Sequence, residues 1–363
     1  MNRMFLFRQL ALGLVLLLAA AAGLKAEPGF RRGVSIAHWM AKVYDPAGPG
    51  APWFGAADIA WIARQGFDHI RYPLDGRLVW RADGTLDEAA LAPLLRALHA
   101  TRDAGLGAVL DLHFLPGGRF EKDAQDPDIF TDPRARAEAA ACWGRLAERF
   151  VAEGDYLRFE LINEPEAPTG DALNALNRVL LAAVRAVDAR RLVYLTTNHA
   201  SRFTTLAELS LPADPRIGIT LHYDEPLVFT HQRAAWKQCP PDMPPVDFPG
   251  RVPDLRPLFQ PGHFAYEASL TEIGAAGIEA DFARVEAWFR QHAPACEVRL
   301  GGFGVNEAAP AAARTRYVRA VRAAAERRGW GWCVWSYNGG MAVRDAGGAP
   351  TPVLAGLFES PAP

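Results

Sequence analysis

From residue 32 onward the chain alternates short apolar runs with amphipathic helical segments, and this alternation restricts the fold more than any other feature. Eight apolar runs have the composition of buried strands, and they cover residues 32–37, 69–74, 107–113, 157–165, 191–198, 217–224, 297–304 and 330–337. Helical periodicity lies between them, most clearly at 86–105, 133–153, 171–189, 279–292 and 311–328. Apolar strands alternating with helices are typical of a parallel sheet covered on both faces. Eight such units predict an α/β fold of the (β/α)8 TIM-barrel type rather than an open sheet.

The first 26 residues follow a different pattern. A basic start precedes an apolar run from Leu10 to Leu24, and small residues follow up to Ala26. This order is typical of a secretory signal peptide, and the run is short for a membrane span of about 20 residues, the alternative interpretation. We therefore expect cleavage of residues 1–26 and export to the periplasm or the cell exterior. Residues 27–363 are expected to form a single domain without a stable membrane anchor.

Composition excludes some classes of partner. The net charge of −2 provides no basic surface for nucleic acid, and we expect none to bind. The chain has four cysteines without metal-ligand spacing, and we expect neither a metal nor another cofactor. Export permits disulfides, so the sequence leaves open whether these residues form bridges, in any of three pairings, or remain buried thiols. They are Cys142, Cys239, Cys296 and Cys333.

Polar and ionisable residues stand where the predicted strands end. In a TIM barrel the carboxyl ends of the strands meet at one face, where active sites are built. The residues at these ends include Arg71, Asp111, His113, Asn163, Glu164, Asn198, His199, His222, Tyr223, Asp224, Gly302, Trp335 and Tyr337. Each of them alone has a structural explanation, such as a core ion pair or a hydrogen-bonded core histidine. Their convergence on one barrel mouth favours a binding or catalytic site.

The stretch ELINEPEAP, residues 160–168, is the most specific of these. It places Glu164 between Asn163 and Pro165 at the end of an apolar strand, where a carboxylate is costly unless it has partners or a role. Asn163 can donate a hydrogen bond to a hydroxyl group, and Glu164 can hold or release a proton. The Pro-rich stretch 239–262 predicts a long loop over the barrel mouth.

Seven ordered motifs resemble glycoside hydrolase family 5, the cellulase and β-glucanase family of clan A. They are RRGVSIAHW, GFDHIRYPL, AVLDLHFLPG, FELINEP, LHYDEPLVFTHQ, LGGFGV and WCVWSY, and they cover essentially the whole chain after the leader. The resemblance implies retaining hydrolysis of β-glucan polysaccharides or oligosaccharides by two glutamates, without a cofactor. We expect a monomer with a β-glucan as its partner.

The resemblance also implies roles for individual residues. Glu164 matches the acid/base, which protonates the leaving glycosidic oxygen and later activates water. Asn163 matches the residue that holds the sugar 2-hydroxyl, and Trp335 matches the aromatic platform under the cleaved sugar. The family's polar collar around that sugar is matched by Arg71, His113, His222 and Tyr223.

The match fails at one residue. The nucleophile of the family is a glutamate at the end of the seventh strand, in a Gly-Glu-Phe-Gly pattern, and this chain has Gly302 at that position. Glycine has no side chain to attack the anomeric carbon, and losing such a group costs several orders of magnitude in rate. We therefore expect weak or absent hydrolysis. Without a like-charged neighbour, the pKa of Glu164 should also be lower than in a Gly302→Glu variant.

Three interpretations of Gly302 remain open in the sequence. The chain is a β-glucanase without its nucleophile, natural or engineered, which includes a glycosynthase-type variant that joins sugars from an α-fluoride donor. Alternatively, it is a non-catalytic carbohydrate-binding protein. In the third interpretation another carboxylate substitutes, with Glu307 nearest in sequence, or Glu307 or Asp224 supports inversion across about 6.5–9.5 Å. The linkage cleaved and the endo or exo mode of action also remain open.

Overall fold

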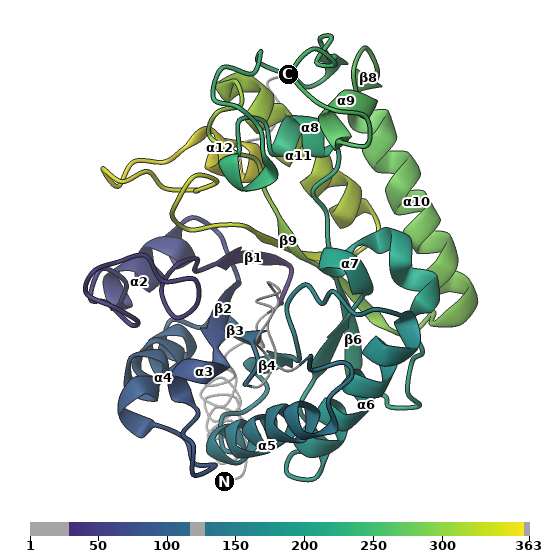
Figure 1. Cartoon of the computed structure of the whole chain (residues 1–363). Coiled ribbons are helices and arrows are strands. Elements are labelled where there is room, and N and C mark those ends of the chain that lie inside the picture. Colours follow the sequence, from purple (N-terminus) through teal and green to yellow (C-terminus); the bar gives the residue numbers. More distant parts are fainter. Residues whose placement is uncertain (1–28, 117–127, 359–363) are drawn as a thin grey trace, which may run out of the picture.

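The computed structural model describes residues 29–116 and 128–358, so the predicted signal peptide lies outside the described residues. Its centre is a closed parallel barrel in the order β1-β10-β9-β6-β5-β4-β3-β2 (Figure 1). The barrel strands are β1 (Arg32–Ser35), β2 (His69–Asp75), β3 (Gly107–Phe114), β4 (Leu157–Glu160), β5 (Val193–Thr196), β6 (Ile217–His222), β9 (Glu297–Phe303) and β10 (Gly331–Val334). Outside the barrel, β7 (Gly250–Arg251) pairs with β8 (Glu272–Ile273) in an antiparallel hairpin. The predicted TIM barrel is confirmed.

Helices form the outer layer of the barrel (Figure 1). The longer ones are α2 (Ala56–Arg64), α4 (Glu88–Asp103), α5 (Pro133–Phe150), α6 (Gly170–Arg185), α10 (Ala275–His292), α11 (Ala311–Arg327) and α12 (Pro352–Phe358). Loops carry the short helices α3 (Gly76–Val79), α7 (Asn198–Ser201), α8 (Leu227–Thr230) and α9 (Phe264–Glu267), with the 3-10 turns η1 (Phe203–Glu208) and η2 (Ala235–Lys237). All five predicted helices are present, whereas α2 and α12 were not predicted. No helix within residues 29–116 and 128–358 has the length and apolar character to cross a membrane.

Side chains on each strand alternate between the two sides of the barrel wall. On β6, Ile219 and Leu221 are buried in the main hydrophobic core between barrel and helices. Thr220 and His222 alternate with them and face the barrel interior, because a Cβ added at Gly301 on the neighbouring strand would contact both. The wall is therefore apolar toward the helices and largely polar on the inside.

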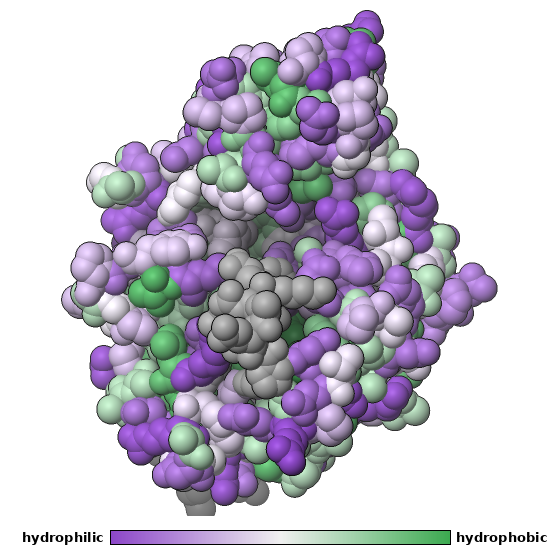
Figure 2. Space-filling view, in the orientation of Figure 1, coloured by the Kyte–Doolittle hydropathy of each residue, from purple (hydrophilic) through white to green (hydrophobic). Residues whose placement is uncertain are grey.

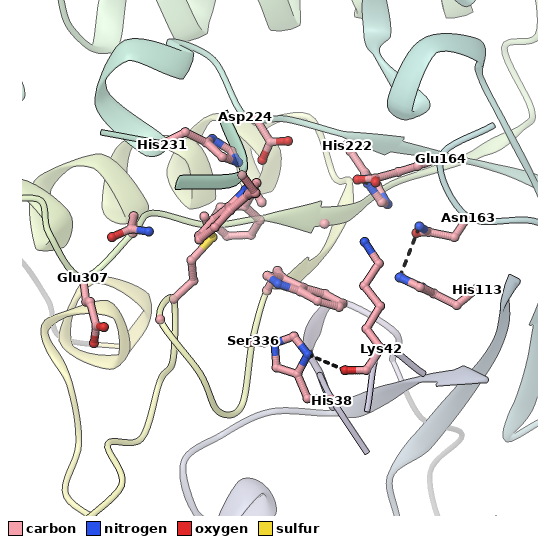
Figure 3. A pocket seen from close by; sticks show the side chains of 18 of the residues that line it. His38, Lys42, His113, Asn163, Glu164, His222, Asp224, His231, Glu307 and Ser336 are labelled. Atoms are coloured by element: carbon pink, nitrogen blue, oxygen red, sulfur yellow. Dashed lines mark hydrogen bonds and ion pairs between the residues drawn. The ribbon is translucent and has the colours of Figure 1, made fainter. Parts of the chain in front are cut away.

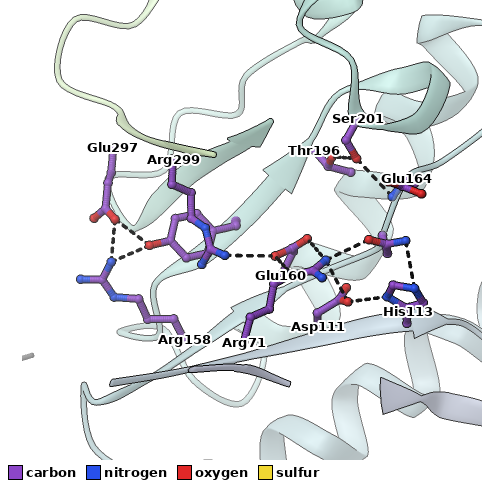
Figure 4. Close-up of polar contacts among 12 residues, drawn as sticks. Arg71, Asp111, His113, Arg158, Glu160, Glu164, Thr196, Ser201, Glu297 and Arg299 are labelled. Carbon is purple, nitrogen blue, oxygen red and sulfur yellow. Dashed lines mark hydrogen bonds and ion pairs between the residues drawn. The ribbon is translucent and has the colours of Figure 1, made fainter. Parts of the chain in front are cut away.

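Buried charges fill the interior beneath the barrel mouth (Figure 4). Arg71 on β2 is completely buried, and it donates hydrogen bonds to both carboxylate oxygens of Glu160 on β4, at 3.0 and 2.7 Å. It also lies 2.9 Å from Oδ2 of Asp111 on β3. Arg299 on β9 stacks over the ring of Tyr194, with 4.7 Å from the guanidinium carbon to the ring centroid. Buried charges are tolerated only with close partners. The ion pairs of Arg71 with Asp111 and Glu160 therefore join β2, β3 and β4 below the cavity.

The Pro-rich stretch 239–262 does not line the barrel mouth within the described structure. Most of its large apolar side chains are buried, with Leu258 exposed, and Phe248 packs on Phe229 of α8 and Tyr317 of α11, with ring centroids 5.4 and 5.3 Å apart. The expected position over the mouth is therefore wrong, because the stretch turns apolar residues such as Phe248 toward α8 and α11.

All four cysteines are free thiols. Cys142, Cys239 and Cys333 are buried, and Cys296 is partly exposed. Burial raises the pKa of Cys142 to about 12 and that of Cys296 to about 11, so both sulfurs stay protonated at neutral pH. The structure contains none of the disulfides that the sequence left open.

Candidate active site

A cavity of about 560 Å³ opens at the carboxyl ends of the strands (Figure 3). The face of the molecule seen in Figure 2 is mostly hydrophilic, with scattered hydrophobic residues. Six of the eight predicted site residues line the cavity: His113, Asn163, Glu164, His222, Gly302 and Trp335. The other two, Arg71 and Tyr223, do not.

Glu164 follows β4 in a strained backbone conformation. Its φ of +43° lies in the left-handed region, which residues other than glycine occupy mainly where the surroundings impose it, often at functional sites. The backbone N–H of Glu164 donates a hydrogen bond to Oγ of Ser201 at 3.1 Å, and Thr196 on β5 donates to the same oxygen at 2.6 Å. These contacts hold the end of β4 against the end of β5 and direct the carboxylate into the cavity.

The carboxylate of Glu164 is paired with His222. Nδ1 of His222 lies 2.7 Å from Oε1 of Glu164. Burial raises the pKa of Glu164, but the hydrogen bond and charge of His222, helped by the charge of Lys42, outweigh burial and lower this pKa to about 2. Glu164 is therefore ionised at neutral pH. The comparison with a Gly302→Glu variant stays a prediction.

Arg71 lies beneath the cavity instead of lining it. The strand β2 continues for four residues beyond Arg71, so its guanidinium is enclosed by the barrel. Its Nη2 donates to Oδ1 of Asn163 at 2.9 Å, and Nδ2 of Asn163 lies 3.4 Å from Nε2 of His113. Nδ1 of His113 lies 2.8 Å from Asp111. Arg71 thus positions Asn163 from below, which corrects its expected place in the polar collar around the sugar.

His113 and Trp335 form one wall of the cavity. Their rings are stacked, with centroids 5.8 Å apart and planes inclined by 11°. Burial lowers the pKa of His113 well below its ordinary value, with Arg71 adding to the effect, so the imidazole is neutral. The wall offers a flat ring and a neutral hydrogen-bonding edge.

Tyr223 points away from the cavity. Its side chain is buried against Phe203 and Phe282, and its hydroxyl donates to Oδ2 of Asp281 at 2.9 Å. The physical reason is the strand alternation, which turns Tyr223 toward the helices when His222 faces inward. The expected contact of Tyr223 with a sugar is therefore wrong.

Gly302 stands on β9 directly beside His222 on β6. A Cβ added at Gly302 would lie 3.3 Å from Cε1 and Nε2 of the His222 ring, and its φ lies outside the left-handed region. At Gly301 the added Cβ would lie 2.0 Å from Oγ1 of Thr220. A side chain can therefore enter the cavity from position 302 after a shift of a few tenths of an ångström by His222, whereas position 301 has no room. Nε2 of His222 is buried without a hydrogen-bond partner among the described atoms.

Several lining residues were not predicted as site residues. The loop after β1 contributes His38, Lys42 and Tyr44, and the segments after β6 and β9 contribute His231, Trp236 and Asn306. The cavity is also lined by Asp224 and Glu307, the two carboxylates for which the sequence left an inverting role open. Tyr44 and Trp236 keep 75 % and 64 % of their side chains exposed. Neither residue belongs to a recognisable motif, so no sequence pattern identifies them as site residues.

The cavity thus combines an ionised carboxylate, histidines, an amide and aromatic rings. Within residues 29–116 and 128–358, no three His, Cys, Asp or Glu side chains are grouped so that they could hold a metal ion. Such a site suits a neutral ligand rich in hydroxyl groups.

Comparison with known proteins agrees with this fold. The family model described as cellulase (glycosyl hydrolase family 5) matches residues 40–340. Endoglucanase C of Acetivibrio thermocellus is 27% identical over 316 residues, which cover 85% of this chain and 91% of that protein. Cellodextrinase A of Ruminococcus flavefaciens is 29% identical over 210 residues, which cover 57% of this chain and 62% of that protein.

Solved structures share the fold. Cel5A of Thermotoga maritima in complex with cellobiose superposes with a TM-score of 0.73 at 21% identity, over 91% of this chain and 98% of that chain. The cellulose synthase subunit Z of Clostridioides difficile superposes with a TM-score of 0.71 at 24% identity, over 91% and 99%. Since the family match spans most of the sequence, this chain belongs to glycosyl hydrolase family 5, the cellulase family of glycosidases.

Proposed function

We propose that this protein binds β-glucan chains in its barrel mouth and that Gly302 impairs retaining hydrolysis. The observation that carries the proposal is the cavity wall formed by Glu164, His222 and Gly302. Glu164 and His222 are joined at 2.7 Å, and the neighbouring strand end presents a glycine where a side chain would fit. In a retaining glycosidase the second carboxylate stands about 5–5.5 Å from the first, and here none is attached at this position.

The other lining residues support binding of a sugar. Asn163, held from below by Arg71, is placed to contact a hydroxyl group through its amide. Trp335, stacked on His113, offers a ring face to the apolar C–H groups of a sugar. Ligand sites of this kind combine aromatic walls with a few oriented polar groups.

The names of the relatives support a β-1,4-glucan as the ligand. Two similar proteins are an endoglucanase and a cellodextrinase, and Cel5A of Thermotoga maritima was solved with cellobiose. The exposed rings of Tyr44 and Trp236 provide contacts for sugar units beyond the one at Trp335. Together they make an oligosaccharide a better ligand than a monosaccharide.

A glycosynthase-type activity is the second candidate. It is favoured by the ionised state of Glu164, which suits a base that removes a proton from an acceptor hydroxyl. With an α-cellobiosyl fluoride donor and a cellobiose acceptor, this activity would yield longer β-linked chains. A pure binding protein would form no product from the same mixture.

The proposal is tested with the wild type and Gly302→Glu on one substrate panel. The panel contains β-1,3-, β-1,4- and mixed-linkage glucans with a mannan control, and Gly302→Ala serves as a matched variant that adds a side chain without a carboxylate. We expect all three proteins to bind cello-oligosaccharides in calorimetry and only Gly302→Glu to release reducing sugar efficiently. Oligosaccharide binding without turnover in Gly302→Glu would favour a binding protein, and absence of both would reject the proposal.

Export and assembly belong to the same proposal. The pattern of the first 26 residues supports cleavage between Ala22 and Ala26 and release to the periplasm or the cell exterior. We propose that the mature protein acts as a monomer. Amino-terminal sequencing and light scattering of the exported protein test these two points.

A further inference from the structure

Asp224 is a second carboxylate of the cavity that the proposed function does not use. It lines the cavity two residues beyond His222 and is partly buried. Its carboxylate accepts no hydrogen bond and forms no ion pair within the described part of the chain. The alternation that turns Tyr223 toward the helices returns Asp224 to the cavity (Figure 3). A carboxylate held at a cavity wall without a partner is available to a bound molecule.

The position of Asp224 places it beside the space at Gly302. His222 pairs in register with Gly302, and the N–H of Tyr223 donates to the carbonyl oxygen of Gly302 at 2.9 Å. The segment that carries Asp224 therefore leaves the barrel alongside the end of β9. Gly302 and Asp224 both line the cavity along these two adjoining segments.

The arrangement relative to Glu164 suits inversion better than retention. Glu164 is bonded to His222, whereas Asp224 lies on the cavity lining apart from that pair, toward His231 (Figure 3). Inverting glycosidases separate their two carboxyl groups by about 6.5–9.5 Å to leave room for the attacking water. In the barrel order, β9 and β4 are three strands apart, so Gly302 and Glu164 approach a bound sugar from different sides.

Glu307 is a poorer candidate for the same role. It lines the cavity but is exposed, and Figure 3 shows it at the opposite end of the lining from Glu164. Its carboxylate oxygen would lie 3.8 Å from a Cβ added at Gly340, in the loop after β10. This places Glu307 at the rim, away from the His222–Gly302 pair.

We propose that Asp224 is the general base of a slow, inverting hydrolysis in this chain. A water molecule beside Gly302 gives a proton to Asp224 as its oxygen bonds to the anomeric carbon. The bond from that carbon to the leaving oxygen breaks, and the leaving group departs as an anion or takes a proton from Glu164. The inference rests on the proposed function because it needs the same sugar in the same cavity.

Aryl glycosides isolate the step that Asp224 performs. Because Glu164 is ionised at neutral pH, it is a poor proton donor, and natural glucans with alkoxide leaving groups are cleaved slowly. 2,4-Dinitrophenyl β-cellobioside carries a leaving group that departs without a proton. Its hydrolysis therefore depends on activation of the water and not on Glu164 as an acid.

The experiment compares the wild type, Asp224→Asn and Glu307→Gln on 2,4-dinitrophenyl β-cellobioside. Product configuration is followed by proton NMR before mutarotation. We expect α-cellobiose as the first product of the wild type, a loss of about 100-fold in kcat for Asp224→Asn and a much smaller loss for Glu307→Gln. Oligosaccharide binding and melting temperature are measured for each variant, so that misfolding is recognised.

Three results would overturn the inference: β-cellobiose as the first product, a wild-type rate no higher than that of Asp224→Asn, or a loss confined to Glu307→Gln. The proposed function fails differently, through a Gly302→Glu variant that neither binds nor cleaves glucans. A Gly302→Glu variant that releases β-cellobiose while the wild type is inert would keep the proposed function and reject the role of Asp224.

Discussion

At the scale of single residues, the state of Glu164 is set by its neighbours. Its backbone is held in the left-handed region, and its carboxylate is bonded to His222 and faces no second carboxylate at position 302. The depressed pKa follows from this environment. In the proposed function, Gly302 leaves the cavity without an attacking group, while His222 keeps Glu164 ionised.

The first prediction concerns the pH dependence of stability. Because the folded pKa of Glu164, about 2, lies below that of an unfolded glutamate, the ionised form stabilises the fold above about pH 4.3, and this contribution is lost as pH falls toward 2. The stability difference between wild type and Glu164→Gln should therefore shrink from pH 5 to pH 3, by at most about 1.4 kcal/mol per pH unit. Urea unfolding of both proteins at several pH values measures this difference in the free energy of unfolding.

Glu166→Gln is the matched control for that titration, since Glu166 is an exposed carboxylate two residues along the chain and, within the described residues, pairs only with exposed His199. Its stability difference from wild type should vary little over the same range. A constant difference between wild type and Glu164→Gln from pH 5 to pH 3 would contradict the account of the Glu164–His222 pair.

At the scale of elements, the two adjacent glycines at the end of β9 have different surroundings. The pairing of β9 with both neighbours shifts register here, between Leu221 and His222 on β6 and between Trp332 and Val334 on β10. Gly301 occupies the shift and faces Thr220, whereas Gly302 faces the cavity. The irregularity directs position 302 toward the ligand.

The second prediction is a contrast between these two glycines. Gly301→Ala should lower the free energy of unfolding by about 1–3 kcal/mol, because its Cβ would overlap the Thr220 hydroxyl. Gly302→Ala should change it by less than about 1 kcal/mol, since only the His222 ring must shift slightly. Denaturant unfolding of both variants measures the contrast, and equal costs would contradict the placement of Gly302 toward the cavity.

The positions of the strands and helices can be predicted from the sequence. The direction in which some strand-end side chains point, such as that of Tyr223, differs from the prediction. Strand and helix positions follow from apolar periodicity, and the strand-end polar residues converge as expected. Tyr223 was assigned to the cavity by motif, although Thr220, His222 and Asp224 alternate with Ile219 and Leu221. This alternation places Tyr223 outside the cavity, and it agrees with Asp224, a predicted strand-end residue, lining it.

The position of Arg71 and the presence of loop residues in the cavity also differ from the prediction, each for its own reason. The depth of Arg71 depends on how far β2 continues beyond it, and strand ends are hard to locate from periodicity. Lys42 and Tyr44 come from the loop after β1, where no periodic pattern exists to orient a side chain. Loop residues of this kind reach the cavity only because the barrel brings the strand ends together.

At the scale of the whole molecule, the barrel holds a charged interior inside an apolar shell. The pairs of Arg71 with Asp111 and Glu160 connect three strands directly below the cavity. Burial raises the pKa of Asp111, while Arg71 holds the pKa of Glu160 below its ordinary value against the effect of burial. Stability and site geometry thus depend on the same network.

The third prediction follows from this network. Arg71→Met should lower the free energy of unfolding by about 3–5 kcal/mol, because it leaves buried carboxylates without their cation. Oligosaccharide affinity should fall as well, since Asn163 loses the donor that positions it. Thermal unfolding and calorimetry measure the two effects, and a variant as stable as the wild type would contradict the account of the interior.

The fourth prediction concerns the thiols. With no disulfide in the fold, reducing agents should leave the melting temperature unchanged, and alkylation after denaturation without reductant should label four cysteines. Mass spectrometry gives the count. Labelling of only two cysteines would show a bridge that the structure lacks.

The central claim is that the residue at position 302 alone separates this chain from an active family 5 glycosidase. It is tested most directly by the initial rate of reducing-sugar release from one β-1,4-glucan by the wild type and Gly302→Glu at equal concentration. The account predicts a kcat/KM at least about 1,000-fold higher for Gly302→Glu. Equal rates from a folded, glucan-binding Gly302→Glu variant would contradict it.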